Sequence, residues 1–254
     1  MSREPSSTSI PQEERGYILV TAVWLLLLGA SIVALIMLKN LNRSEELGFE
    51  RQQVRVDDAK EGALETAIAD LIFNGSDSQF AFLPARTEYE IDNFEISVKA
   101  NSEHGKIDLN QADPEMVRRA LQGLGISRAQ REAFVLSMMQ RRERRIPLRS
   151  GHDVRKIFFE AGIIPRDEFC ANLYFTVFSG QTQPQASQMD PRLARALGEV
   201  VLANSDRARA GTPIRFEIST RQGRPLVAVV RISGLLDKSH EVMDWGSLAC
   251  VDRH

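Results

Sequence analysis

The chain is 254 residues long, with 43% hydrophobic residues, 26% charged residues and a formal net charge of −2 at pH 7. A charge so close to zero indicates no particular class of partner. The two cysteines, Cys170 and Cys250, are too few for a disulfide-stapled scaffold. In an oxidising compartment they can form one disulfide; the alternative is two buried thiols.

The charge is distributed unevenly along the sequence. Residues 44–103 contain fourteen Asp and Glu against five Lys and Arg, a net of −9. Residues 108–168 contain nine acidic residues against twelve basic ones, a net of +3. The sequence therefore predicts an acidic segment nearer the N-terminus and a basic segment beyond it.

Residues 17–38 contain no charged residue. As a helix that rises about 1.5 Å per residue, this run is roughly 33 Å long, enough to cross a bilayer core of about 30 Å. A secretory signal peptide ends in small residues after its apolar core. Here a polar leader, residues 1–16, ends in Gly16 before the apolar core instead.

This junction resembles a prepilin leader. The resemblance implies that a prepilin peptidase cleaves between Gly16 and Tyr17, that the new N-terminus is methylated, and that residues 17–38 remain as a transmembrane helix. Lys and Arg are balanced on the two sides of the apolar run, so an N-terminus on the cytoplasmic side also rests on the resemblance. The alternative is an ordinary single-pass anchor with a glycine at its edge.

A helix is expected to continue to about Phe73, because residues 44–73 contain no proline and place apolar side chains near one face. The expected apolar stripe consists of Val56, Ala59, Ala63, Leu64, Ala67, Ile68, Leu71 and Ile72. Asn74 and Gly75 form a helix stop signal. The narrow stripe predicts that this half of the helix packs on another surface.

Alternating apolar and polar residues predict strands in two distant regions, about 88–100 and 213–246. A long N-terminal helix on a mostly antiparallel sheet is the pilin-like fold, of class α+β. We therefore predict a pilin-like domain in two pieces, residues 39–107 and 206–254. The residues between them, 108–205, are predicted to form an inserted all-α domain.

The first helix of this insert is expected to begin at Asp113-Pro114, where Asp caps the helix and Pro occupies its first turn. Asp190-Pro191 repeats this start signal, so a second copy of the same helical unit is one interpretation and chance is the other. The remaining expected elements are a helix from Ser127 to about Arg145, helices over 150–161 and 165–173, and a polar loop over 181–188.

Three segments carry a more specific resemblance. Residues 106–112, KIDLNQA, with the Asp-Pro-Glu that follows, resemble the start of the helical insert in general secretion pathway protein K. Residues 175–180, FTVFSG, resemble that family's exit from the first helical unit, and the segments 228–232 and 242–245 resemble its C-terminal strands. The chain is thus similar to the large minor pseudopilins of the type II secretion system.

The family resemblance implies a non-catalytic protein without cofactors, anchored once in the bacterial inner membrane with its C-terminal domain in the periplasm. It implies that the protein initiates and caps the periplasmic pseudopilus. The implied partners are the I-type and J-type minor pseudopilins, the major pseudopilin and the prepilin peptidase. The family lacks the glutamate that other pilins carry at the fifth mature position, and Thr21 stands there in this chain. The alternative is that Thr21 is merely a tolerated small polar residue.

The segment 121–126, LQGLGI, followed by an arginine-rich helix, resembles a helix-hairpin-helix. Such a hairpin can present backbone N–H groups to a nucleic-acid phosphate. The alternative function is therefore a membrane-anchored DNA-binding protein of a DNA-uptake system. We favour a tight helix connection with a solvated arginine face and no nucleic-acid partner, because no aromatic residue is interleaved for base stacking.

The sequence shows no motif of a catalytic or metal site. It contains no Cys-x-x-Cys, no HExxH, no phosphate-binding loop and no Gly-x-Ser-x-Gly, and its four histidines are scattered. Residues 74–78, NGSDS, place oxygen donors in one loop, a composition that can suit calcium but is more typical of a polar turn.

Overall fold

A computed structural model describes the chain except for residues 1–11, 165–170, 200–205, 222–223, 234–238 and 248–254. Within helix α1, the side chains of residues 12–19, 36 and 38–51 are also outside the description. The chain divides into two units, Met1–Arg55 and Val56–His254.

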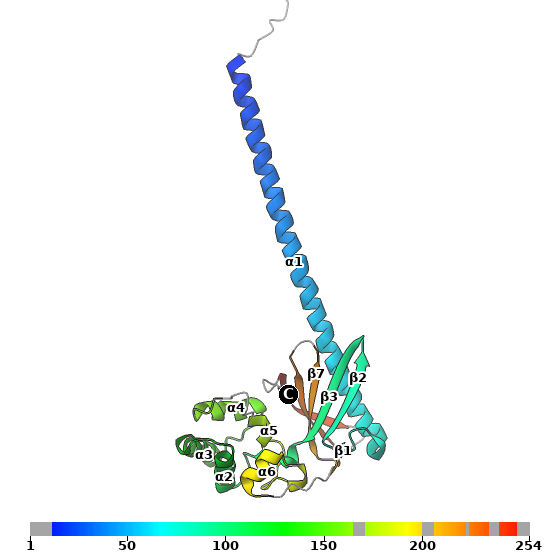
Figure 1. Cartoon of the computed structure of the whole chain (residues 1–254), viewed down its shortest axis with the longest axis vertical. Coiled ribbons are helices and arrows are strands. Elements are labelled where there is room, and N and C mark those ends of the chain that lie inside the picture. Colours follow the sequence, from blue (N-terminus) through cyan, green and yellow to red (C-terminus); the bar gives the residue numbers. More distant parts are fainter. Residues whose placement is uncertain (1–11, 165–170, 200–205, 222–223, 234–238, 248–254) are drawn as a thin grey trace, which may run out of the picture. The chain divides into compact units, whose positions relative to one another are not determined.

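Helix α1 runs from Gln12 to Asn74 (Figure 1). Its part up to Arg55 contains all described residues of the first unit, and its part from Val56 onward is the first helix of the second unit. It ends at the predicted stop, Asn74, and a short 3-10 helix, Gly75–Asp77, follows.

The second unit contains a five-stranded antiparallel sheet with the order β2-β3-β7-β8-β9. Its strands are β2 Ala85–Ile91, β3 Phe94–Ser102, β7 Pro213–Thr220, β8 Leu226–Ile232 and β9 His240–Ser247. These strands confirm the two predicted strand regions. The neighbours β3 and β7 come from different regions, so the sheet is continuous across the insertion.

The apolar stripe of α1 packs on one face of this sheet. All predicted stripe residues except Ile72, which is partly buried, are less than 9% exposed. Except for Val56, the buried stripe residues form one core with alternate strand residues such as Val98, Phe216 and Val230. One charged residue lies within this face of the helix. Lys60 is 2% exposed, and its ammonium donates to Asp57 and to the carbonyl of Arg224 at 2.9 Å each.

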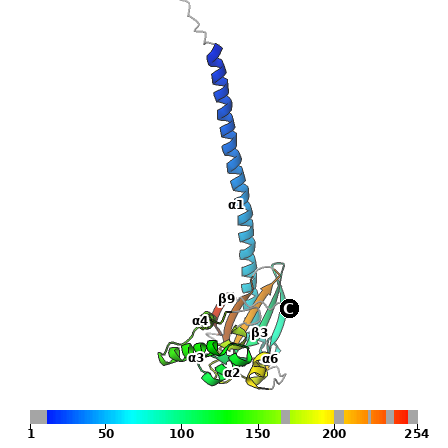
Figure 2. The ribbon, with the colours of Figure 1, turned by 60° about the vertical axis from the view of Figure 1, so that its left-hand side comes forward.

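The chain leaves the sheet after β3 and returns at β7, where Ser102 pairs with Ile214. Between them lie α2 Pro114–Gly123, α3 Arg128–Glu143, α4 Gly151–Glu160, α5 Ala171–Tyr174, a 3-10 helix Ala186–Gln188 and α6 Pro191–Leu197. These helices gather beside the sheet (Figures 1 and 2). They enclose a second core, in which the rings of Phe134, Phe158 and Phe175 lie 4.4 to 6.2 Å apart between centroids.

The helix starts predicted at Asp113, Ser127, Ser150 and Asp190 are confirmed by their caps, whereas the start predicted at residue 165 lies outside the described residues. The carboxylates of Asp113 and Asp190 each accept a backbone N–H two residues ahead, at 2.8 Å. Ser150 and Asp153 form a reciprocal capping box at the start of α4. Four short strands were not predicted: β1 Phe82–Leu83 pairs with β6 Asp206–Arg207, and β4 Ile107–Asp108 pairs with β5 Phe175–Thr176.

Candidate functional site

The predicted processing site lies at the start of α1. Gly16 and Tyr17 belong to the helix, but their side chains are outside the described set, as is the whole of residues 1–11. Thr21, one turn further along, is partly exposed. Cys170 and Cys250 lie outside the described residues. The cleavage, the role of Thr21 and the disulfide therefore stay predictions.

The described part of α1 in the first unit exposes an apolar surface. Its large exposed side chains are Val20, Val23, Trp24, Leu25, Leu26, Leu27, Leu28, Ile32, Val33, Leu35 and Met37, which are 48% to 73% exposed. Exposed apolar surface of this extent marks a contact with protein or membrane.

Within the described residues, no helix combines the length and the apolar character needed to cross a membrane.

The helix-hairpin-helix segment connects α2 and α3. Gly123 lies against α6, where a Cβ added to it would approach the Cβ of Ala196 to 2.3 Å. Gly125 has a φ of +80°, a conformation that glycine adopts without strain. Close packing therefore explains the glycine at position 123, and backbone conformation explains the glycine at position 125. Both fit a tight helix connection.

Several nearby arginines already donate hydrogen bonds to acceptor groups of the protein itself. Arg118 binds the carboxylates of Glu115 and Glu132, and Arg131 donates to the carbonyl of Ile126 at 2.7 Å. Arg141 pairs with Glu160 at 3.3 Å. The geometry of these three arginine side chains therefore adds no support to the DNA-binding alternative.

The NGSDS loop is organised by a residue of α1. The carboxylate of Asp70 accepts from the amide of Asn74, the hydroxyl of Ser78 and the backbone N–H of Gln79. These bonds lower the pKa of Asp70 despite its partial burial. No cluster of three or more His, Cys, Asp or Glu suited to a metal ion occurs among the described residues.

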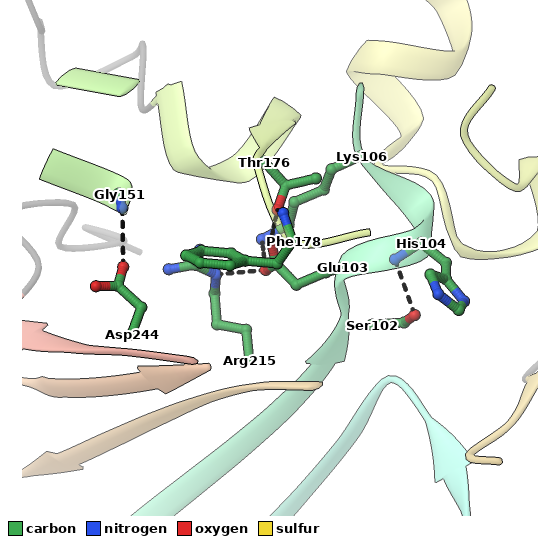
Figure 3. Close-up of polar contacts among 9 residues, drawn as sticks. All are labelled: Ser102, Glu103, His104, Lys106, Gly151, Thr176, Phe178, Arg215 and Asp244. Carbon is green, nitrogen blue, oxygen red and sulfur yellow. Dashed lines mark hydrogen bonds and ion pairs between the residues drawn. The ribbon is translucent and has the colours of Figure 1, made fainter. Parts of the chain in front are cut away.

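A buried ionic cluster stands where the insert meets the sheet (Figure 3). Glu103, in the turn Glu103–Gly105 that follows β3, is completely buried. Its Oε1 accepts from the Arg215 guanidinium and from the Lys106 ammonium, both at 2.6 Å. Its Oε2 accepts from the hydroxyl of Thr176, which in turn accepts the backbone N–H of Phe178 at 3.2 Å.

The members of this cluster come from three parts of the chain. Arg215 belongs to β7 of the sheet, Lys106 to the segment that enters the insert, and Thr176 to the segment that leaves the first helices. The carboxylate of Glu103 thus connects the sheet to the segment that enters the insert and to the segment that leaves its first helices. Charge-assisted hydrogen bonds of this kind are short and directional.

The electrostatics agree with a paired cluster. Burial opposes the ionisation of Glu103, but Arg215 and Lys106 outweigh it and lower its pKa to about 2. Burial, together with the positive charge of Arg215, lowers the pKa of Lys106 to about 8. Glu103 is therefore a carboxylate at neutral pH, and Lys106 is the group of the cluster that titrates nearest to neutrality.

The KIDLNQA segment forms a second, polar network beside the cluster. Asp108 is 1% exposed and accepts the backbone N–H groups of Asn110 at 2.8 Å and Gly180 at 2.7 Å. Burial raises the pKa of Asp108, although these bonds oppose the change. The side-chain amide of Asn110 bonds reciprocally with the backbone of Leu148. The KIDLNQA segment thus has a structural role: its side chains bind the backbone at Leu148 and at Gly180.

A further contact joins β9 to the insert. The carboxylate of Asp244 accepts the backbone N–H of Gly151 at 2.9 Å, at the start of α4. Figure 3 shows it on the side of Arg215 away from Lys106. A negative charge at a helix N-terminus is favourable.

The sequence did not point to Glu103 or Arg215. Arg215 alternates with Ile214 and Phe216 in β7, so its polar position indicates a solvent-facing side chain, yet it is 3% exposed because the insert covers that face. Lys106 is the first residue of the KIDLNQA segment, next to Ile107, which is buried. A lysine directly beside an apolar residue of this segment was the one feature of the sequence that pointed to the cluster.

No family model matches the sequence, and no curated protein matches it. The structure is similar to a chain in the crystal structure of the GspK-GspI-GspJ complex from the type 2 secretion system of enterotoxigenic Escherichia coli. The TM-score is 0.50 at 9% sequence identity, and the similarity covers 81% of this chain and 99% of that chain. The chain has a pseudopilin-like fold. The predicted α+β, pilin-like architecture is confirmed at this level.

Proposed function

We propose that this protein is a minor pseudopilin of the type II protein secretion system, of the K type, which initiates and caps the periplasmic pseudopilus. The observation that carries the proposal is a mainly helical insertion between β3 and β7 of a pseudopilin-like domain. A bulky insertion at one place in a pilin-like subunit suits a terminal position, because it hinders the stacking of a further subunit.

The partners proposed for it are the I-type and J-type minor pseudopilins. The similar solved structure is a complex of GspK with GspI and GspJ, which supports this choice. The major pseudopilin below and the prepilin peptidase complete the set. The exposed apolar surface of α1 between Val20 and Met37 suits the lipid and the neighbouring helices of such an assembly.

The tip position also draws on Thr21. A carboxylate at that depth in a membrane needs a partner charge, because an unpaired charge there costs several kcal/mol. A subunit with Thr21 carries no carboxylate that needs the amine of a subunit above it. Its own amine at Tyr17 remains available to a subunit below.

The role proposed here is structural and uses no cofactor and no catalytic residue. The protein is placed by the proposal in the bacterial inner membrane, with one span over 17–38 and the domain after it in the periplasm.

Mass spectrometry of the protein purified from its host membranes tests the processing step. We expect an N-methylated N-terminus at Tyr17 and, for Gly16→Leu, an uncleaved precursor. A mature N-terminus after Ala30 would identify an ordinary signal peptide and refute the proposal. Cross-linking of assembled filaments tests the position, with about one copy expected at one end only.

A further inference from the structure

Strand β9 is an edge strand whose two faces are covered unequally. On one face, Asp244 binds the first residue of α4, and Figure 2 shows β9 beside that helix. On the other face lie Val242 and Trp245, opposite Val230 and Ala228 of β8. This second face is the one on which α1 packs.

A bulge brings the two apolar side chains to the same face. In a regular strand, residues three apart point to opposite faces. Here Val242 pairs with Val230 and Trp245 with Ala228, two positions apart, so Met243 is the extra residue. Bulges re-aim side chains and also make an edge less suited to pairing with another strand. The bulge therefore favours recognition through side chains over addition of a sixth strand.

Helix α1 covers this face of the sheet as far as β8 but leaves β9 exposed. Ala228 and Val230 are 0% exposed, whereas Val242 and Trp245 are 44% and 45% exposed. No other large apolar side chain in the described residues of the five strands is exposed to this degree. Tryptophan is among the residue types most enriched at the energetic centres of interfaces.

An acidic row of α1 lies near the same end of the sheet. Asp57, Glu61 and Glu65 are exposed and follow one another at four-residue spacing, which places them along one side of the helix. Lys60, which pairs with Asp57, also donates to the carbonyl of Arg224 between β7 and β8. This flank of α1 thus faces the β8 end, whereas Gly62 lies against Ile91 of β2.

We propose that Val242 and Trp245, with the acidic row Asp57, Glu61 and Glu65, form the docking surface for one neighbouring minor pseudopilin. The charges determine its chemistry: the partner presents an apolar ridge flanked by Lys or Arg. Residues 44–103, which include the row, carry a net charge of −9, so a basic partner is complementary. This inference rests on the proposed function, which supplies the I-type and J-type subunits as partners.

Binding of the full-length protein to tagged I-type and J-type subunits, co-produced and extracted in mild detergent, tests the surface. We expect Trp245→Ala to weaken the complex about 30-fold or more, the effect of a central interface residue. Glu61→Lys should weaken it less, and mainly at low salt. The control is Phe159→Ala, which removes an even more exposed aromatic side chain, from α4, and should leave binding unchanged.

A photo-cross-linking amino acid at position 242 identifies the occupant, with position 88 on the opposite edge strand β2 as control. Adducts to an I-type or J-type subunit from 242 alone support the docking surface. Adducts to residues 248–254 of the same chain or to a second copy overturn it, as does unchanged binding of Trp245→Ala. Failure of the wild-type protein to bind either subunit overturns the proposed function itself.

Discussion

The second unit contains two hydrophobic cores of different kinds. The core under α1 is mostly aliphatic and consists of one helix stripe against alternate strand residues. The core of the insert is centred on aromatic rings contributed by Phe134, Phe158 and Phe175. The two sets share no residue. Among the described residues, the polar contacts that join the insert to the sheet include the Glu103 cluster and the bond from Gly151 to Asp244.

The difference indicates how a helical domain can be carried by a pilin-like sheet. Hydrophobic burial is non-directional, so each core can stabilise its own part without fixing how the parts are oriented. Hydrogen bonds between charged groups have defined geometry. We therefore infer that burial provides most of the stability of each part, and that the Glu103 cluster sets the orientation between them.

The largest effect is expected at the junction. Glu103→Ala removes the common partner of Arg215 and Lys106 and leaves two buried cations unpaired, so we expect a loss of about 3–5 kcal/mol of unfolding free energy. Urea denaturation measures it. The control is Glu88→Ala, which breaks an exposed pair with Arg86 and should cost about 0–1 kcal/mol. Equal losses for the two variants would mean that the junction contributes nothing special.

The separation of the two cores is tested by paired substitutions. Ile157→Ala in the insert and Ile218→Ala in the sheet each remove a fully buried side chain and should cost about 2–5 kcal/mol. Hydrogen exchange should then show lost protection in α2 to α4 for the first variant and in β3, β7 and β8 for the second. Loss of protection throughout the unit in both variants would show one cooperative core.

The charged state of the junction predicts a dependence of stability on pH. The pKa of Lys106 is about 8 in the folded chain, against 10.5 as the ordinary value. Between these values the unfolded chain binds more protons, so the free energy of unfolding should rise with pH, by up to roughly 3 kcal/mol.

The control is Lys106→Met, which should lack this alkaline rise. Glu103 affects the stability at acidic pH. Its folded pKa of about 2, against 4.5, gives stability that is present above pH 4.5 and lost as the pH falls toward 2. Identical alkaline profiles for Lys106→Met and the wild type would contradict the assignment.

The fold was largely predictable because its patterns are local. Helix caps such as Asp113 act within a few residues, and the stripe from Val56 to Leu71 follows helical periodicity. The buried role of Arg215 was not predictable, because its environment is created by segments more than a hundred residues away. An arginine between apolar residues of a strand indicates a solvated face unless another domain covers it.

The docking pair was missed for the same kind of reason. Val242 and Trp245 lie three residues apart, which in a regular strand places them on opposite faces. Only the pairing with β8 reveals the bulge that brings them together. The prediction that residues 108–205 form a separate inserted domain stays a prediction that the paired core substitutions address.

The smallest effect is expected at the second polar tether. Asp244→Ala removes the acceptor for the backbone N–H of Gly151, which then lacks the bond that satisfies it at the start of α4. Loss of such a cap costs about 1–2 kcal/mol, less than the loss of Glu103 because no buried cation is left behind. Asp244→Asn keeps a carbonyl acceptor and loses only the charge, so it should cost a few tenths of a kcal/mol. Hydrogen exchange at Gly151 gives the direct readout: faster exchange in Asp244→Ala than in Asp244→Asn supports the tether. Unchanged exchange in both variants would leave the Glu103 cluster as the joint that orients the insert.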